Sequence, residues 1–310
     1  MCGIAGIIYR DGQHEVGRDM TRMLQAMKHR GPDSTGYALY HPPQDGLLVM
    51  RYTLADATTP RDLEFEERLR RHRAEVERRL VDLGARLHEV EQETEYAYRA
   101  TLEYKGDLKL LADIIEDIPD AEVLSLGRSL EIVKDLGDAE SVSQQYHLDR
   151  FVGTHAIGHV RMATESEVDI AGAHPYWAYP FSDVAVVHNG QLTNYFQWRR
   201  RLERSGHRFM SECDSEVIAV YLAEKMSEGK SLEEAMHDSL DELDGVFTYI
   251  AVTDDALGVA KDELAAKPLV LYEGDDMVAL ASEEIAIRQV VDREIETYDP
   301  YEREVLVWQR

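Results

Sequence analysis

Cys2 is the residue of this 310-residue chain whose position alone suggests a reaction. Removal of Met1 would leave a first residue that carries both a thiol and a free α-amine. An α-amine titrates at about pH 7.7–8.0, so part of it is unprotonated near neutral pH and can accept the thiol proton. One residue would then supply nucleophile and base, and Gly3 would leave room for a substrate to approach. Taken alone, Cys2 is also consistent with an incidental small hydrophobic residue.

Five short motifs elsewhere in the chain favour the catalytic interpretation. They occur in the order MCGIAGI, HRGPDSTG, GHVRMAT, HNGQLTN and SECDSEV. Each motif is weak on its own, but together they resemble the class II glutamine amidotransferases, which are N-terminal nucleophile hydrolases. The resemblance covers about residues 1–54 and 151–290.

This resemblance implies a role for each matching residue. Cys2 matches the catalytic nucleophile, and Asn189 and Gly190 match the oxyanion hole. Arg161 matches the arginine that binds the glutamine α-carboxylate, a group that a guanidinium fork binds through two hydrogen bonds. Asp214 matches the acid that pairs with the glutamine α-ammonium group, although an Asp in this position also suits a helix N-cap.

Further residues match the family around the site. Thr164 corresponds to a residue close to the substrate. Arg30 and Asp33 lie in the loop beside the nucleophile, where we expect them to support the site without taking part in the chemistry. Cys213 has no catalytic counterpart, so we expect a packed thiol.

Some positions depart from the common family pattern and narrow the resemblance. Met162 stands where many relatives have an aromatic residue, Glu165-Ser166 where some have His-Gly, and Gln191 where Glu is commoner. The segment ATESEVDIAGAHPYW is most similar to the amidotransferase part of glutamate synthases. It is closer still to the separate amidotransferase-like subunit of N-methylglutamate synthase-type complexes.

We therefore expect hydrolysis of L-glutamine to L-glutamate and ammonia through a Cys2 thioester, with no metal or cofactor on this chain. No Rossmann fingerprint, P-loop or cysteine cluster is present to bind a flavin, ATP or an iron–sulfur cluster. The ammonia would be used by a partner of the glutamate synthase or N-methylglutamate synthase type, which would hold FMN and iron–sulfur clusters. Two alternatives are a non-catalytic regulatory or interaction subunit of such a hetero-oligomer and an enzyme of the same fold that acts on a different amide.

The elements that position these residues alternate between short apolar strands and amphipathic helices. We expect strands at 4–9, 37–40, 155–160, 184–188, 247–253, 269–272 and 278–281, and helices at about 18–28, 214–226 and 231–243. This mixture favours an α+β fold. The resemblance specifies it as the four-layer sandwich of the N-terminal nucleophile hydrolases, with two mainly antiparallel sheets between helical layers.

Residues 55–150 are interpreted as a module inserted within one amidotransferase domain that spans 1–310. Apolar residues recur at helical spacing from Glu64 to Glu91, and Gly84 is expected to end or break this helix. A strand at 96–104, a helix at 107–118 and a strand at 123–133 should follow. The module would serve packing or an interface without chemistry of its own, and a free coiled-coil arm is the alternative.

The composition limits the partners of the chain. Its 60 acidic residues against 34 Lys and Arg give a formal net charge of −26, which disfavours nucleic acid and anionic membranes. No apolar run is long enough to span a bilayer and no export signal is visible, so we expect a cytoplasmic protein. Two cysteines in that setting predict neither a disulfide nor a zinc site.

Overall fold

Two antiparallel sheets form the centre of the protein in the computed structural model, which describes residues 2–162, 170–178 and 183–310. The six-stranded sheet has the order β13 (Val270–Glu273), β14 (Met277–Ala281), β1 (Gly3–Tyr9), β8 (His155–Arg161), β2 (Ser34–Tyr40) and β7 (Leu130–Leu136). The five-stranded sheet has the order β15 (Val305–Gln309), β12 (Ala256–Lys261), β11 (Gly245–Val252), β10 (Ala185–Leu192) and β9 (Tyr176–Trp177). β1 is an inner strand of its sheet, so Cys2, which directly precedes it, lies at the end of a central strand.

A shared hydrophobic core joins the two sheets. Ile7 of β1 and Leu257 of β12 are both fully buried in it. The sheets approach closely at Gly6, where a Cβ atom would lie 3.2 Å from a methyl carbon of Leu257.

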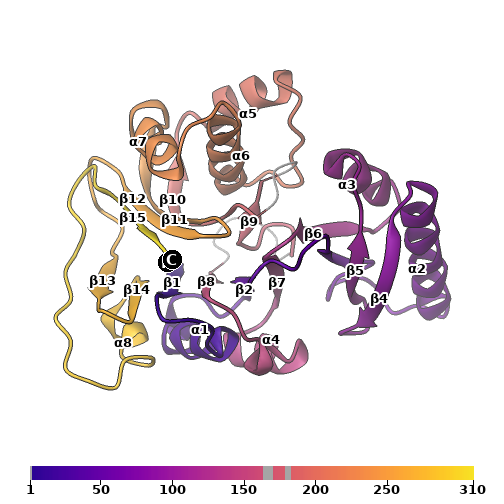
Figure 1. Ribbon diagram of the computed structural model, residues 1–310, viewed down its shortest axis with the longest axis horizontal. Coiled ribbons are helices and arrows are strands. Elements are labelled where there is room, and N and C mark those ends of the chain that lie inside the picture. The colour runs from indigo at the N-terminus through magenta and orange to yellow at the C-terminus, as the bar shows by residue number, and fades with distance from the viewer. Residues whose placement is uncertain (1, 163–169, 179–182) are drawn as a thin grey trace.

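Helices cover the outer face of each sheet (Figure 1). The helices α1 (Val16–Ala26), α4 (Ala139–Gln145) and α8 (Glu284–Ile287) lie on the six-stranded sheet, and α6 (Asp214–Ser227) and α7 (Leu232–Glu242) lie on the five-stranded sheet, with α5 (Tyr195–Arg204) packed against α6. This arrangement of helix, sheet, sheet and helix confirms the α+β sandwich expected from the sequence.

A third sheet forms a module at the right of Figure 1. Its strand order is β4 (Arg86–Gln92), β5 (Ala97–Glu103), β3 (Leu48–Thr53) and β6 (Glu122–Gly127), and the helices α2 (Phe65–Asp82) and α3 (Leu108–Glu116) accompany it. Leu69, Val76 and Leu80 of α2 are buried, so this helix packs on the module and is not a free coiled-coil arm. The third strand in this order, β3, precedes residue 55, so the module begins before the boundary expected from the sequence.

Two secondary-structure expectations within 55–150 are wrong. Gly84 ends the helix as expected, because it adopts a left-handed φ of +87° just after the last helical residue, Asp82, but residues 86–92 form a strand on β5 and do not continue the helical segment to Glu91. The single strand expected at 123–133 is two strands, β6 and β7, which belong to different sheets. The carboxylate of Asp183 fixes the turn between them by accepting hydrogen bonds from the backbone N–H groups of Arg128, Ser129 and Leu130.

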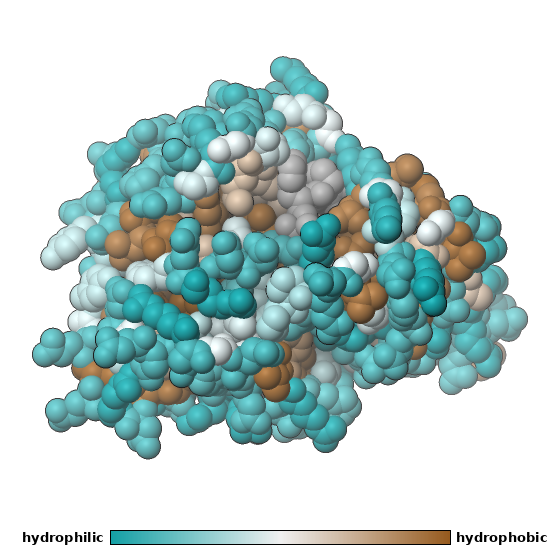
Figure 2. All heavy atoms as spheres, viewed as in Figure 1, coloured by the Kyte–Doolittle hydropathy of each residue, from teal (hydrophilic) through white to brown (hydrophobic). Residues whose placement is uncertain are grey.

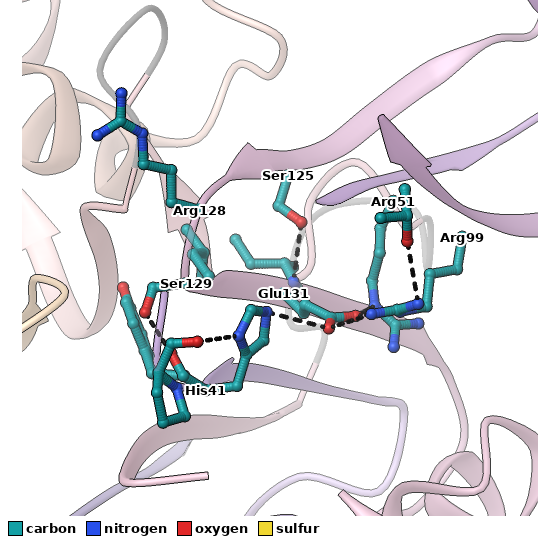
Figure 3. A network of polar contacts seen from close by, with 12 residues as sticks. His41, Arg51, Arg99, Ser125, Arg128, Ser129 and Glu131 are labelled. Atoms are coloured by element: carbon teal, nitrogen blue, oxygen red, sulfur yellow. Dashed lines mark hydrogen bonds and ion pairs between the residues drawn. The ribbon is translucent and has the colours of Figure 1, made fainter. Parts of the chain in front are cut away.

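Buried charges connect the module to the six-stranded sheet (Figure 3). Glu131 of β7 accepts hydrogen bonds from Arg51 Nε at 2.7 Å and from Arg99 Nε at 2.9 Å. The Nε2 atom of His41 lies 3.5 Å from Oε1 of the same carboxylate. Burial alone would raise the pKa of Glu131, but the two guanidinium groups lower it to about 2. A buried carboxylate between two arginines is therefore a fixed junction between β7 and the module strands β3 and β5.

The surface is largely hydrophilic on the face that Figure 2 shows, with hydrophobic residues in separate patches. Within the described residues, no helix combines the length and the apolar character that a bilayer crossing requires.

Candidate active site

Cys2 lies at the junction of three elements. It precedes β1 directly, and its backbone carbonyl accepts one hydrogen bond from Arg30 Nε at 3.1 Å and another from Asn189 Nδ2 at 3.2 Å. Arg30 ends a 3-10 turn (Lys28–Arg30), whereas Asn189 belongs to β10 of the opposite sheet. Two donors from distant parts of the chain therefore hold the Cys2 main chain, and the residue remains partly exposed.

One cavity of about 1190 Å³ brings most of the expected site residues together. Its lining includes Cys2, Arg161, Asn189, Gly190 and Asp214. These five residues come from β1, β8, β10 and α6, so the cavity opens where the two sheets and the helix α6 meet. Thr164, which was expected near the substrate, lies outside the described residues.

Arg30 and Asp33 lie behind this cavity and do not line it. Arg30 is buried, and its guanidinium also pairs with Glu283 at 2.6 Å. The backbone N–H of Asp33 donates to the carbonyl of Arg161 at 3.1 Å, which ties the loop to the end of β8. Through the Arg30 Nε bond to the Cys2 carbonyl and the Asp33 N–H bond to the Arg161 carbonyl, both residues hold the main chain of a cavity residue.

The main chain at Asn189 and Gly190 requires glycine at the second position. Gly190 has a φ of +151°, and a Cβ atom there would lie 2.2 Å from the carbonyl oxygen of Val246 on the neighbouring β11. Asn189 is almost fully buried, and its side-chain amide has two N–H donors, of which one is directed to the Cys2 carbonyl. The Asn-Gly pair is thus part of a strand and not the ordinary turn that the dipeptide often forms.

Asp214 is the first residue of α6 and not its N-cap, a position that Cys213 takes. Its carboxylate accepts a hydrogen bond from the backbone N–H of Leu192 at 2.7 Å, which connects the start of α6 to the end of β10. The side chain keeps 21% of its surface exposed, and the residue lines the cavity, where a ligand can contact it.

Three histidines line the same cavity and were not assigned from the sequence. His159 and His174 stack with ring centroids 4.1 Å apart, and the backbone N–H of His188 donates to His174 Nδ1 at 3.2 Å. Burial lowers the pKa of all three, to about 3 for His159, so the rings are neutral near pH 7. The Nε2 atoms of His159 and His188 have no hydrogen-bond partner within the described structure. A sequence signal was present, because His159 and His188 lie within two of the five motifs and His174 within the segment ATESEVDIAGAHPYW, but a lone histidine is ordinarily a core residue.

Cys213 lies on the cavity wall, 3.7 Å from His174 Nε2. Burial raises the pKa of its thiol, and the nearby Asp214 carboxylate acts in the same direction. A protonated thiol is a poor nucleophile, so Cys213 is less suited to attack than its position in the cavity suggests. Across the described ranges, no group of three or more His, Cys, Asp or Glu side chains is placed to hold a metal ion.

Comparison with known proteins gives one consistent result. Residues 159–289 match the model of a family described as a glutamine amidotransferase domain. A protein of Methanothermobacter thermautotrophicus classed as a glutamine amidotransferase is 42% identical over 308 residues, which cover 97% of this chain and 98% of the relative. The glutamine amidotransferase-like protein GlxB of Rhizobium meliloti is 35% identical, with 99% and 98% of the two chains covered.

A solved structure supports the same fold. The glutamine phosphoribosylpyrophosphate amidotransferase of B. subtilis, complexed with ADP and GMP, aligns with a TM-score of 0.62 at 20% sequence identity. The alignment covers 99% of this chain but 47% of that protein, so this chain spans about half of the length of that enzyme.

Proposed function

The chain belongs to the class II glutamine amidotransferases, and on that premise we propose that Cys2 hydrolyses L-glutamine and that the ammonia passes to a synthase partner. The observation that carries the proposal is the meeting of Cys2, Arg161, Asn189, Gly190 and Asp214 around one cavity. These residues are far apart in the sequence, and each has the chemistry that a step of the reaction needs.

The amino-acid end of glutamine binds first. Arg161 receives the α-carboxylate through its guanidinium fork, and Asp214 receives the α-ammonium group. The neutral state of His188, whose Nδ1 lies 3.9 Å from Asp214, supports this assignment, because a neutral imidazole leaves the negative charge of the carboxylate available to the substrate.

The chemical step starts at the Cys2 sulfur. The α-amine of Cys2 takes the thiol proton, and the thiolate attacks the side-chain amide carbon to form a C–S bond. Asn189 Nδ2 still has one N–H to offer after its bond to the Cys2 carbonyl, so it and the Gly190 N–H stabilise the oxyanion. The α-ammonium of Cys2 then gives its proton to the amide nitrogen, the C–N bond breaks, and ammonia leaves. Water hydrolyses the thioester, which releases glutamate and restores the thiol.

The acceptor of the ammonia is proposed from the sequence around residues 163–177 and from Gln191. A partner of the glutamate synthase or N-methylglutamate synthase type would hold FMN and iron–sulfur clusters, and this chain would carry none. The two would then work as a hetero-oligomer.

The test compares the two cysteines in a glutaminase assay. We expect Cys2→Ala to abolish glutamate release and Cys213→Ala, a matched thiol in the same cavity, to retain it. Intact-mass measurement should show that Met1 is absent, and a diazo-ketone analogue of glutamine should label Cys2 alone. Labelling of Cys213, or full activity in Cys2→Ala, would refute the assignment. A wild-type chain that binds its synthase but never hydrolyses glutamine would support the alternative of a non-catalytic interaction subunit.

A further inference from the structure

A short segment, residues 206–213, forms one wall of the candidate active site. It connects α5 to α6, its residues Phe209 to Cys213 line the cavity, and Asp214 follows directly. On the side of α6, the carboxylate of Glu216 accepts hydrogen bonds from the backbone N–H groups of Met210 at 2.6 Å and Ser211 at 2.8 Å. This side of the wall is therefore fixed within the sandwich itself.

The other side of the wall segment is held by the four-stranded module. Lys109 at the start of α3 donates a hydrogen bond to the backbone carbonyl of Gly206. Arg208 Nη1 donates to Asp113 Oδ1 at 3.0 Å, and Arg208 Nη2 lies 3.8 Å from Glu116 Oε2. α3 thus contacts the wall along three successive turns, through residues 109, 113 and 116.

Glu116 is the buried end of this contact, and its Oε2 atom lies beyond hydrogen-bond distance from Arg208. Its side chain is only 1% exposed, and its other oxygen accepts the backbone N–H of Val123 on β6 at 3.0 Å. The far end of the contact is therefore anchored in the sheet of the module, whereas an exposed pair between two mobile side chains contributes little. Arg208 lies between that anchored carboxyl group and the more exposed Asp113, to which it is hydrogen-bonded, so a movement of α3 is transmitted to the wall segment.

We propose that Arg208 is a positioning residue for glutamine, and that the module sets the affinity of the cavity through its contact with α3. This inference rests on the proposed function, because it takes the cavity as the glutamine site. The wall carries Phe209 to Cys213 and leads into Asp214, so displacement of the wall changes the affinity of the cavity for the amino-acid end of glutamine. Cys2 directly precedes β1, the Asn-Gly pair lies on β10, and none of the three residues makes these contacts, so the chemical step should be preserved.

The experiment measures KM and kcat for glutamine in Arg208→Ala, Arg208→Lys and Arg78→Ala. Arg78 is the matched control, because it is an arginine of the same module whose ion pairs, with Glu75 and Asp82, stay within α2. We expect Arg208→Ala to raise KM by about three- to tenfold while kcat stays within about twofold, which is the pattern of lost binding without lost chemistry. Arg208→Lys should be intermediate, and Arg78→Ala should match the wild type.

Three results would overturn the inference: an unchanged KM in Arg208→Ala, an equal rise in Arg78→Ala, or a fall of kcat at constant KM. If Arg208→Ala fails to fold, as judged by near-UV circular dichroism, KM and kcat of Asp113→Asn are judged by the same criteria, since this variant removes the carboxylate that binds Arg208 Nη1 and keeps Glu116.

Calorimetric titration of glutamine into Cys2→Ala, with and without Arg208→Ala, measures the same effect on affinity without turnover. If the wild type has no glutaminase activity, the proposed catalysis fails, but the shift in the dissociation constant still decides the role of Arg208. Absence of any glutamine binding would overturn both the proposed function and the role of Arg208.

Discussion

Glu116 should make the stability of the protein depend on pH in a way that one substitution removes. Burial raises the pKa of this carboxyl from 4.5 to about 8, despite the opposing effects of the Val123 N–H and Arg208. The folded state therefore binds the proton more tightly than the unfolded state. The stability from this group is fully present below pH 4.5 and is lost as the pH rises to about 8. Between these values each pH unit costs about 1.4 kcal/mol, and the full crossing up to about 5 kcal/mol.

Glu116→Gln replaces the ionisable group with a neutral side chain of the same shape that can still accept the Val123 N–H. The free energy of unfolding of the variant minus that of the wild type should grow by up to about 2.7 kcal/mol between pH 5.5 and 7.5, which is two pH units. It should level off above about pH 8. Urea unfolding followed by circular dichroism at half-unit pH steps measures this difference, and contributions from all other titrating groups cancel in the subtraction.

The control is Glu67→Gln, which neutralises an exposed acid on α2 of the same module. Its difference from the wild type should be small and nearly independent of pH, because an exposed carboxylate interacts similarly with water in both states. A Glu116→Gln difference that stays flat from pH 5.5 to 7.5, or that shrinks as the pH rises, would refute the reasoning. Glu116 would then be ionised at neutral pH and paired with Arg208 as a simple buried ion pair.

Two further predictions concern the cavity and the junction of the module. Asn189→Ala should lower kcat by about 10²–10³-fold and change KM little, because the oxyanion forms only after binding; steady-state kinetics would contradict the assignment if KM alone changed. Glu131→Ala should reduce the free energy of unfolding by about 3–5 kcal/mol in urea titrations, because it removes the carboxylate shared by the buried Arg51 and by Arg99 and leaves Arg51 with Glu93 alone, and a loss below about 1 kcal/mol would show that water replaces the pair.

The sequence predicted the strands of the central sheets better than the elements of the module. Strands such as β1 and β14 are apolar runs between turn signals, and both were predicted within about two residues. The convergence of Cys2, Arg161 and Asp214 on one cavity came from the family resemblance, because no local pattern connects residues so far apart. Local periodicity cannot show which strands will pair at long range.

Failures of prediction follow from tertiary contacts. Residues 86–92 continue the apolar spacing of α2, but a left-handed glycine at 84 and pairing with β5 turn them into a strand. β6 and β7 were merged into one strand because the carboxylate that fixes the turn between them, Asp183, lies more than fifty residues later. The three cavity histidines were overlooked because their meeting depends on the pairing of β8 and β10 with their neighbours and not on sequence spacing.

The register of β2 and β7 shows how the module is joined to the rest of the enzyme. These strands pair antiparallel with Tyr40 opposite Leu130, so everything from residue 41 to residue 129 is, in topological terms, the loop of a single β-hairpin. A two-residue Asn-Gly turn between Tyr40 and Leu130 would close the same hairpin. Such a miniaturised enzyme would also need Glu131 changed to an uncharged residue, because the arginines that neutralise it would leave with the loop. Residues 41–129 are thus attached to the core at one hairpin, and Glu131 is the core residue whose charge depends on that attachment.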